Sequence, residues 1–274
     1  MYFDTHTHTM HSCDSSKIPE DGVLTAIKNG LSGIAITDHS DLRLFEPYNI
    51  PTEIPASCRE ADRLAEKYKG KIQVFSGIEI SDAAIPRYHD RLDAALNFYD
   101  YDTVLASVHI VDLYDKPCEF SSTDFSNFDT ETLTKLMDTY FEYMLKTVYE
   151  NSYSALCHVT YPLRYINGIY KHGFTLDSYT KRIEDIFKVI IDKKIALEIN
   201  TAKCTKDNPC AFCPEEDLLE LYLSVGGKMF SLASDSHIAG SEGRCFENAA
   251  AFLKEHGIFG CYYFKKREPI YYEI

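Results

Sequence analysis

The chain has 274 residues, 45% of them hydrophobic, and a formal net charge of −14 at pH 7. This length suits one large α/β barrel as well as two small domains, and the apolar share is sufficient for a buried core. The acidic balance argues against a nucleic-acid partner, because a polyanion is normally bound by a basic surface and the chain has no run of Lys or Arg. A small anionic substrate remains compatible with this charge, since bound metal cations can reverse the sign of the local field.

The chain begins with the strand-like run Tyr2-Phe3-Asp4, without the basic and apolar regions of a signal peptide. No apolar stretch approaches the roughly 20 residues that a membrane helix needs. The nine cysteines are scattered and odd in number, which favours free thiols in a reducing compartment over a disulfide framework. We therefore expect a cytoplasmic protein with no membrane partner, and the sequence leaves its oligomeric state open.

Short strand-like runs and amphipathic segments alternate through the whole chain. The runs rich in β-branched and apolar residues are 32–37, 72–80, 103–108, 155–159, 195–200, 229–233 and 257–264. The segments with helical spacing include 53–68, 131–149, 176–192 and 215–225. This alternation indicates βαβ units and a parallel sheet. With seven or eight units and no break in composition, we predict a closed α/β barrel in a single domain, residues 1–274; an open doubly wound sheet is the alternative.

Two stretches, 112–129 and 203–214, carry no clear helix or strand pattern. Both follow predicted strands, so in a barrel they lie at the end where active sites are built and can shape access to a substrate.

Histidines and acidic residues fall at the ends of the predicted strands. In chain order they are His6 and His8, Asp38 and His39, Glu79, His109, His158, Glu198 and Asn200, and Asp235 and His237. One histidine beside an apolar run is usually a core or surface residue, and each member of this set is a weak signal alone. Together they are a strong one, because the carboxyl ends of parallel strands meet at one rim, and so many imidazoles and carboxylates there need a cation among them.

The ligand set is larger than one ion can use. A catalytic zinc ion takes about three protein ligands and keeps one position open, so a set of this size indicates two or three ions, with Glu79 suited to bridge two. Mixed imidazole and carboxylate donors fit zinc, manganese or iron. Ions about 3.5–4 Å apart can hold a phosphoryl group, supply hydroxide and stabilise the leaving oxygen.

The order of these motifs resembles the PHP family, from Asp4-Thr-His-Thr-His to Ser234-Asp-Ser-His237, and the resemblance covers nearly the whole chain. It implies a distorted seven-stranded (β/α) barrel with a trinuclear metal site. Carried over residue by residue, it implies three ligand groups: His6, His8, Glu79 and Asp235; Glu79, His109 and His158; and His39, His237 and Asp14.

Within the family the chain is most similar to the histidinol-phosphate phosphatases, in Arg164-Tyr165 and in the run Leu197-Glu-Ile-Asn-Thr201. The resemblance implies hydrolysis of L-histidinol phosphate in histidine biosynthesis. Thr205 stands where those phosphatases usually have a second arginine, so Lys203 or Lys206 is the expected substitute, and Thr160 replaces a frequent Asp. These departures leave another small phosphate monoester or a nucleotide as the alternative substrate.

The expected phosphate contacts are Arg164, Asn200, Lys203 and Lys206. Arg164 offers paired donors to phosphate oxygens, and its alternative reading is a surface ion pair. Asp235 or His39 is the candidate for handling the proton of the leaving group. Two further hypotheses are a nuclease on the same scaffold and a non-catalytic metal-binding protein.

Cys204, Cys210 and Cys213 cluster in one segment, and no second Cys-x-x-Cys pair completes a four-thiolate site. We expect structural or incidental thiols there.

Overall fold

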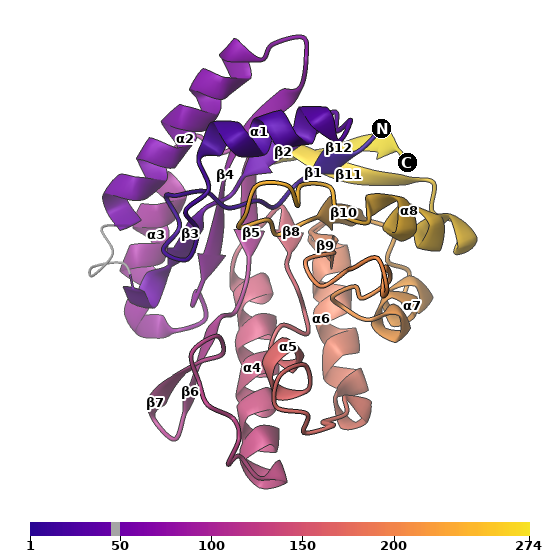
Figure 1. The fold of residues 1–274 in the computed structure, drawn as a ribbon. Coiled ribbons are helices and arrows are strands. Elements are labelled where there is room, and N and C mark those ends of the chain that lie inside the picture. The colour runs from indigo at the N-terminus through magenta and orange to yellow at the C-terminus, as the bar shows by residue number, and fades with distance from the viewer. Residues whose placement is uncertain (45–49) are drawn as a thin grey trace.

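The computed structural model describes residues 1–44 and 50–274, which form a barrel of parallel strands surrounded by helices (Figure 1). The hydrogen-bonded order is β1-β2-β4-β5-β8-β9-β10, with β3 pairing beside β4 beyond the end of β2. These strands are β1 (Phe3–Asp4), β2 (Gly33–Ile36), β3 (His39–Asp41), β4 (Gln73–Ser81), β5 (Thr103–Ala106), β8 (Ala155–Leu156), β9 (Ala196–Asn200) and β10 (Phe230–Ala233).

The barrel closes between its first and last strands. Thr7 and Ser236 form a parallel bridge, and the backbone N–H groups of His8 and Asp235 donate across this seam to the carbonyls of Ser236 (2.9 Å) and His6 (2.9 Å). The predicted closed α/β barrel is therefore confirmed. All residues of β2, β5 and β10 are buried, as expected for parallel strands that are covered on both faces.

Helices cover the outside of the barrel. They are α1 (Pro19–Lys28), α2 (Ile50–Lys67), α3 (His89–Asn97), α4 (Thr130–Glu150), α5 (Leu163–Ile166), α6 (Thr180–Asp192), α7 (Glu216–Ser224) and α8 (Phe246–Glu255), with 3-10 turns η1 (Leu42–Leu44), η2 (Pro86–Tyr88) and η3 (Asp177–Tyr179). α4 begins where Asp129 accepts a hydrogen bond from Thr132 N, and it buries a stripe at helical spacing that includes Leu133, Met137 and Met144. Within the described residues, no helix combines the length and the apolar character that crossing a membrane requires.

The last predicted strand lies outside the barrel. Residues 257–264 contribute to β11 (Gly260–Lys265), which pairs antiparallel with β12 (Glu268–Glu273). The turn of this hairpin lies at the end of the barrel where strands begin, because the N–H groups of Lys266 and Arg267 donate to Asp102, the residue before β5. The β1–β10 seam leaves no free edge at which this segment could join the barrel.

The stretch 112–129, predicted to be irregular, overlaps a hairpin made of β6 (Ile110–Leu113) and β7 (Lys116–Glu119). Its turn residues Tyr114 and Asp115 have φ of 51° and 59°, the left-handed conformation that a two-residue hairpin turn of type I′ needs. The prediction of no strand there was wrong because the apolar–polar alternation over four residues is too short to recognise. Residues 203–214 contain no helix or named strand, as predicted.

Candidate metal centre

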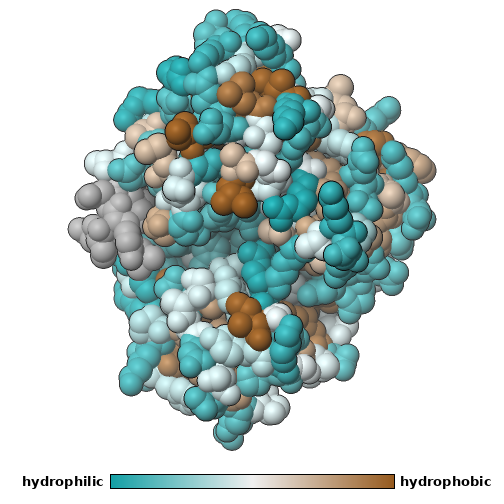
Figure 2. Space-filling model, in the orientation of Figure 1, coloured by the Kyte–Doolittle hydropathy of each residue, from teal (hydrophilic) through white to brown (hydrophobic). Residues whose placement is uncertain are grey.

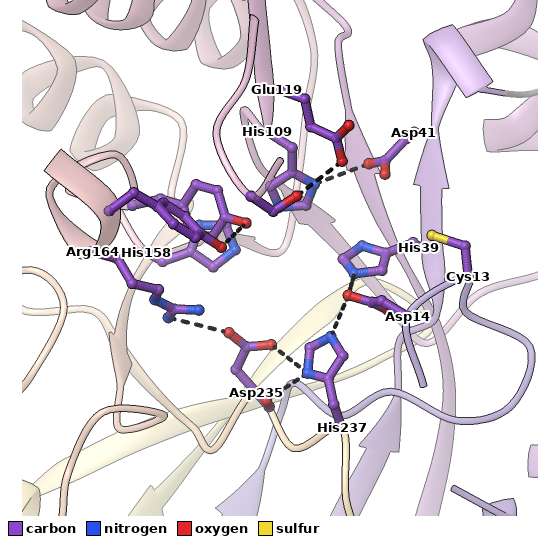
Figure 3. Close-up of a pocket in the computed structure, with 13 residues that line it drawn as sticks. Cys13, Asp14, His39, Asp41, His109, Glu119, His158, Arg164, Asp235 and His237 are labelled. Atoms are coloured by element: carbon purple, nitrogen blue, oxygen red, sulfur yellow. Dashed lines mark hydrogen bonds and ion pairs between the residues drawn. The ribbon is translucent and has the colours of Figure 1, made fainter. Parts of the chain in front are cut away.

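The ligand-type side chains meet at the end of the barrel where the strands finish. A cavity of about 280 Å³ opens there, and residues from several strand ends line it (Figure 3). Its lining includes Asp14, His39, Asp41, His109, His158, Asp235 and His237. The face in Figure 2 is mostly hydrophilic, with apolar side chains scattered over it.

Four donor atoms form the first group. His6 Nε2 and His8 Nε2 are 2.9 Å apart, and they lie 3.3 and 3.5 Å from Glu79 Oε2. Asp235 Oδ1 lies 3.8 Å from His6 Nε2 and 3.3 Å from His8 Nε2. Ligands about 2.1 Å from a tetrahedral ion are about 3.4 Å from one another, so these spacings fit one zinc-like ion.

Glu79 joins this group to a second one. Its other oxygen, Oε1, lies 3.2 Å from His109 Nε2 and 2.9 Å from His158 Nε2. The two carboxylate oxygens therefore face different sets of imidazoles, which is the arrangement of a bridging ligand. Glu79 Oε2 is fully buried and accepts no hydrogen bond, although it lies 2.8 Å from His39 Nδ1. A buried carboxylate oxygen without a hydrogen bond is costly, and a cation would offset that cost.

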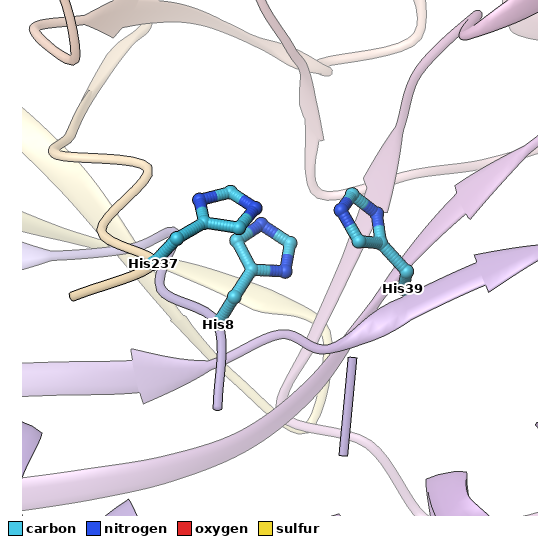
Figure 4. A group of neighbouring side chains, drawn as sticks. All are labelled: His8, His39 and His237. Carbon is cyan, nitrogen blue, oxygen red and sulfur yellow. The ribbon is translucent and has the colours of Figure 1, made fainter. Parts of the chain in front are cut away.

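A third group surrounds Asp14, in the turn after β1. Asp14 Oδ2 lies 3.1 Å from His237 Nε2 and 3.4 Å from His39 Nε2. The His8 ring stacks at 4.2 Å from both the His39 and the His237 rings, so this group adjoins the first one (Figure 4). The structure thus brings all nine sequence-predicted metal ligands together in three adjoining groups, as the donor pattern of a site for two or three ions requires.

Outer hydrogen bonds orient the imidazoles. His6 Nδ1 donates to Glu198 (2.7 Å), and His109 Nδ1 donates to Asp41 (2.9 Å). His237 Nδ1 donates to the Asp235 carbonyl (2.9 Å). Ionised carboxylates and carbonyls only accept, so each Nδ1 carries the hydrogen and each Nε2 presents its lone pair to the centre.

The direction of the hydrogen bonds around Ser12 also determines which ring nitrogen of His8 carries the hydrogen. The Ser12 hydroxyl donates to Asp38 and lies 3.1 Å from His8 Nδ1, so it must accept the His8 hydrogen. Asp38 itself accepts from Thr9 N and from the Thr9 and Ser57 hydroxyls. Asp38 therefore stabilises the loop after β1, whereas the ring of the adjacent His39 faces the metal-ligand groups.

Neighbouring side chains keep the two central carboxyl groups of the site ionised. Burial by itself raises the pKa of the Glu79 carboxyl, but His109, His6 and His39 lower that pKa well below its usual range. Burial also raises the pKa of Asp235, and His6, His8 and Arg164 bring it well below normal. For His8, burial and the neighbouring His237 and His39 lower the pKa well below its ordinary value, which keeps the ring neutral.

Two of the donors have strained backbones. His158 and Asp235 have φ of 26° and 49°, a region that non-glycine residues rarely adopt and that costs about 1–3 kcal/mol each. Hydrogen bonds hold them there: His158 N donates to Glu198 Oε1 (3.2 Å), and Asp235 N donates to the His6 carbonyl (2.9 Å). The backbone strain at these two residues fixes the direction in which each ligand side chain enters the site.

Arg164 is on α5, which follows the His158 loop. Its Nη2 lies 3.5 Å from Asp235 Oδ2, its guanidinium lies over the Tyr161 ring, and its buried Nε makes no hydrogen bond. Arg164, Tyr161 and Tyr165 line the same cavity as the metal ligands. The guanidinium is therefore in the site, and its ion pair with Asp235 leaves donors available to an anion.

The other expected phosphate contacts lie elsewhere. The Asn200 amide donates to Glu198 (2.9 Å) and Asp235 (3.2 Å), so it braces a ligand, and it does not line the cavity. Lys203 lines a neighbouring cavity with Glu215, and desolvation and the Arg164 charge lower the pKa of its ammonium to about 8. Lys206 lines a third cavity beside Tyr2, away from the ligand groups, because the chain turns between Thr205 and Asn208.

The cysteines of this segment are free thiols, of which Cys204 and Cys213 are buried and Cys210 is exposed. Burial raises the pKa of Cys204 and of Cys213 to about 12, so both remain protonated and are poor ligands.

Sequence reasoning missed two parts of the site. Asp41, the partner of His109, follows His39 by two positions in β3 and so shares its side of the strand, a period-two signal that could have identified it. Glu119 and Ser121 also line the cavity, and they reach it through the β6–β7 hairpin.

Known proteins resemble this chain over most of its length. The chain is 30% identical to a probable histidinol-phosphatase of Clostridium acetobutylicum, over 91% of each chain. It is 29% identical to the histidinol-phosphatase of Lactococcus lactis subsp. lactis, over 93% of this chain and 91% of that one. A crystal structure of histidinol phosphate phosphatase from Lactococcus lactis, complexed with zinc, L-histidinol and phosphate, superposes with a TM-score of 0.80 at 25% identity over 98% of both chains.

The PHP domain family matches residues 4–202, a range that holds seven of the nine donor residues. With the barrel, the strand-end ligands and these relatives in agreement, the chain belongs to the PHP domain family.

Proposed function

We propose that this chain is a metal-dependent phosphatase that hydrolyses L-histidinol phosphate to L-histidinol and phosphate. The observation that carries the proposal is Glu79, whose two oxygens face separate imidazole groups beneath a cavity that also holds Arg164. The relatives named as histidinol-phosphatases, and the solved relative that binds zinc, L-histidinol and phosphate, support the choice of substrate.

Two or three divalent ions, zinc, manganese or iron, fit the donors. Their proposed ligands are His6, His8, Glu79 and Asp235 for one, Glu79, His109 and His158 for a second, and His39, His237 and Asp14 for a third. Such ions, when bound, supply Lewis-acid stabilisation of phosphate oxygens and activate a water nucleophile.

The protein's own groups position and neutralise the substrate. Arg164 binds phosphate oxygens through its N–H groups and stabilises the negative charge that grows on them in the transition state. Its contact with Asp235 aligns the guanidinium beside the first ligand group. Asp235 or His39 delivers the proton to the leaving oxygen, since both line the cavity. Because the pKa of Asp235 is well below its usual range, its carboxylate would first take that proton from the attacking water.

We also propose a cytoplasmic location, a small substrate and a single-domain organisation for this chain. Nine free cysteines support a reducing, cytoplasmic location. The net charge of −14 supports a small substrate over a nucleic acid. The contact of the C-terminal hairpin with β1, where Tyr263 stacks on Phe3 at 3.9 Å, supports one domain over residues 1–274.

The test is phosphate release from L-histidinol phosphate with zinc, manganese or iron supplied, beside glycerol phosphate, a nucleoside monophosphate and a single-stranded oligonucleotide. We expect the highest kcat/KM for L-histidinol phosphate and no turnover by Glu79→Gln. Faster hydrolysis of another monoester would refute the substrate, and turnover by Glu79→Gln equal to the parent would refute the site.

A further inference from the structure

Glu119 reaches the cavity from the hairpin that follows the ligand His109. It is the last residue of β7 and pairs with Ile110, and the next residue, Phe120, donates its N–H to the His109 carbonyl (3.2 Å). The base of the hairpin is thus fixed to a metal-ligand backbone. Glu119 and Ser121 line the same cavity as His109, Arg164 and Asp235, and Figure 3 shows Glu119 and Arg164 on different sides of it.

The carboxylates around this cavity differ in their partners. Asp14 faces His39 and His237, Asp41 accepts from His109, and Asp235 faces His8 and Arg164. Each of these three already neighbours an imidazole or a guanidinium.

Glu119 has hydroxyl partners instead. Its Oε1 accepts from Ser121 (2.9 Å) and its Oε2 from Ser122 (3.0 Å), and no Lys, Arg or His of the described residues lies within 4.0 Å. Two hydroxyl donors orient the carboxylate and leave its charge without a cation. Each oxygen retains capacity to accept a further hydrogen bond.

We propose that Glu119 binds a protonated amine of the substrate, so that the enzyme selects phosphate monoesters that carry an ammonium group close to the ester. The inference rests on the proposed function, and it assigns a binding partner to the substrate's ammonium group. L-Histidinol phosphate has its amine on the carbon next to the phosphorylated one. With the phosphate at the ligand groups and Arg164, the ammonium meets the half-buried Glu119 carboxylate in a charge-assisted hydrogen bond.

The test compares two substrates in one variant. Glu119→Gln keeps the shape and an acceptor for the serine hydroxyls but removes the charge. We expect its kcat/KM for L-histidinol phosphate to fall about 10- to 100-fold, the usual worth of a hydrogen bond to a charged group. For 3-(imidazol-4-yl)propyl phosphate, which lacks only the amine and therefore the stereocentre that carries it, kcat/KM should remain near that of the parent enzyme. Retained hydrolysis of this analogue also shows that the variant is folded and binds its metals.

Asp115→Asn is the matched control. Asp115 lies in the turn of the same hairpin, it is exposed, and its left-handed backbone suits asparagine. The Asp115→Asn variant removes one negative charge outside the cavity and should leave kcat/KM unchanged for both substrates. An equal loss on both substrates, or no loss on either, would overturn the role of Glu119.

A second substrate pair separates this inference from the proposed function. If the parent enzyme does not hydrolyse L-histidinol phosphate, the proposed function fails, and O-phosphoethanolamine and ethyl phosphate replace the pair. A preference for the amine-bearing ester that disappears in Glu119→Gln would support the inference by itself, and its absence would refute it.

Discussion

A buried ion pair connects the two loops that flank the barrel seam. Lys17 Nζ donates to Glu242 Oε1 (2.9 Å), to the Ser236 carbonyl (2.8 Å) and to the Ser236 hydroxyl (3.0 Å). The side chains of Lys17 and Glu242 are only 1% and 0% exposed. Ser236 lies between the ligands Asp235 and His237, so this ammonium holds the segment that supplies both.

Lys17→Met removes the cation and leaves the Glu242 carboxylate buried. Because breaking one partner of a buried pair strands the other charge, we expect the free energy of unfolding to fall by about 3–5 kcal/mol. The double variant Lys17→Met/Glu242→Gln removes both charges and should lose about 1–3 kcal/mol less than the sum of the two single variants. Urea unfolding at fixed metal concentration measures both quantities, with Lys28→Met, an exposed lysine on α1, as the control.

Either of two results would contradict this expectation. If Lys17→Met lowered the free energy of unfolding by less than about 1 kcal/mol, the effect would be that of a solvent-exposed ion pair and would contradict a buried one. If the double variant lost as much free energy of unfolding as the two single variants together, the two charges would not interact.

Three further predictions concern the metal centre. Glu79→Gln should lower the metal content by at least one ion per chain, because an amide nitrogen does not ligate, and metal analysis equal to the parent would contradict the bridge. Glu198→Gln weakens the hydrogen bond that orients His6, so metal affinity measured against a competing chelator should fall about 10- to 100-fold; unchanged affinity would leave Glu198 without this role. Arg164→Ala should raise the inhibition constant of inorganic phosphate about 10- to 100-fold while metal content stays unchanged. An unaltered constant would remove Arg164 from the phosphate site.

The barrel and its ligands could be predicted because their signals are local. Each strand is a short buried run, and most ligands lie in such a run or shortly after it, as Glu79 lies in β4 and His158 follows β8. Asp14 lies ten residues after β1, and only the family resemblance identified it. Parallel strands then bring their ends together without any further information in the sequence.

The rest of the site depends on how loops pack, which periodicity does not encode. Glu119 reaches the cavity only because the β6–β7 hairpin folds back at Tyr114 and Asp115. Lys203 and Lys206 are three residues apart in the sequence, yet they line different cavities. From charge and spacing alone, both lysines are expected to contact the phosphate.

The first ligand group also has a consequence for how the enzyme is made. Its donors come from residues 6, 8, 79 and 235, so a nascent chain carries three of them long before the fourth leaves the ribosome. Domains generally begin to fold from the N-terminus during synthesis, but this barrel can close only after residue 236 pairs with residue 7. The metal centre is therefore completed after translation of nearly the entire chain, and a truncated product that ends before β10 would lack a complete first group.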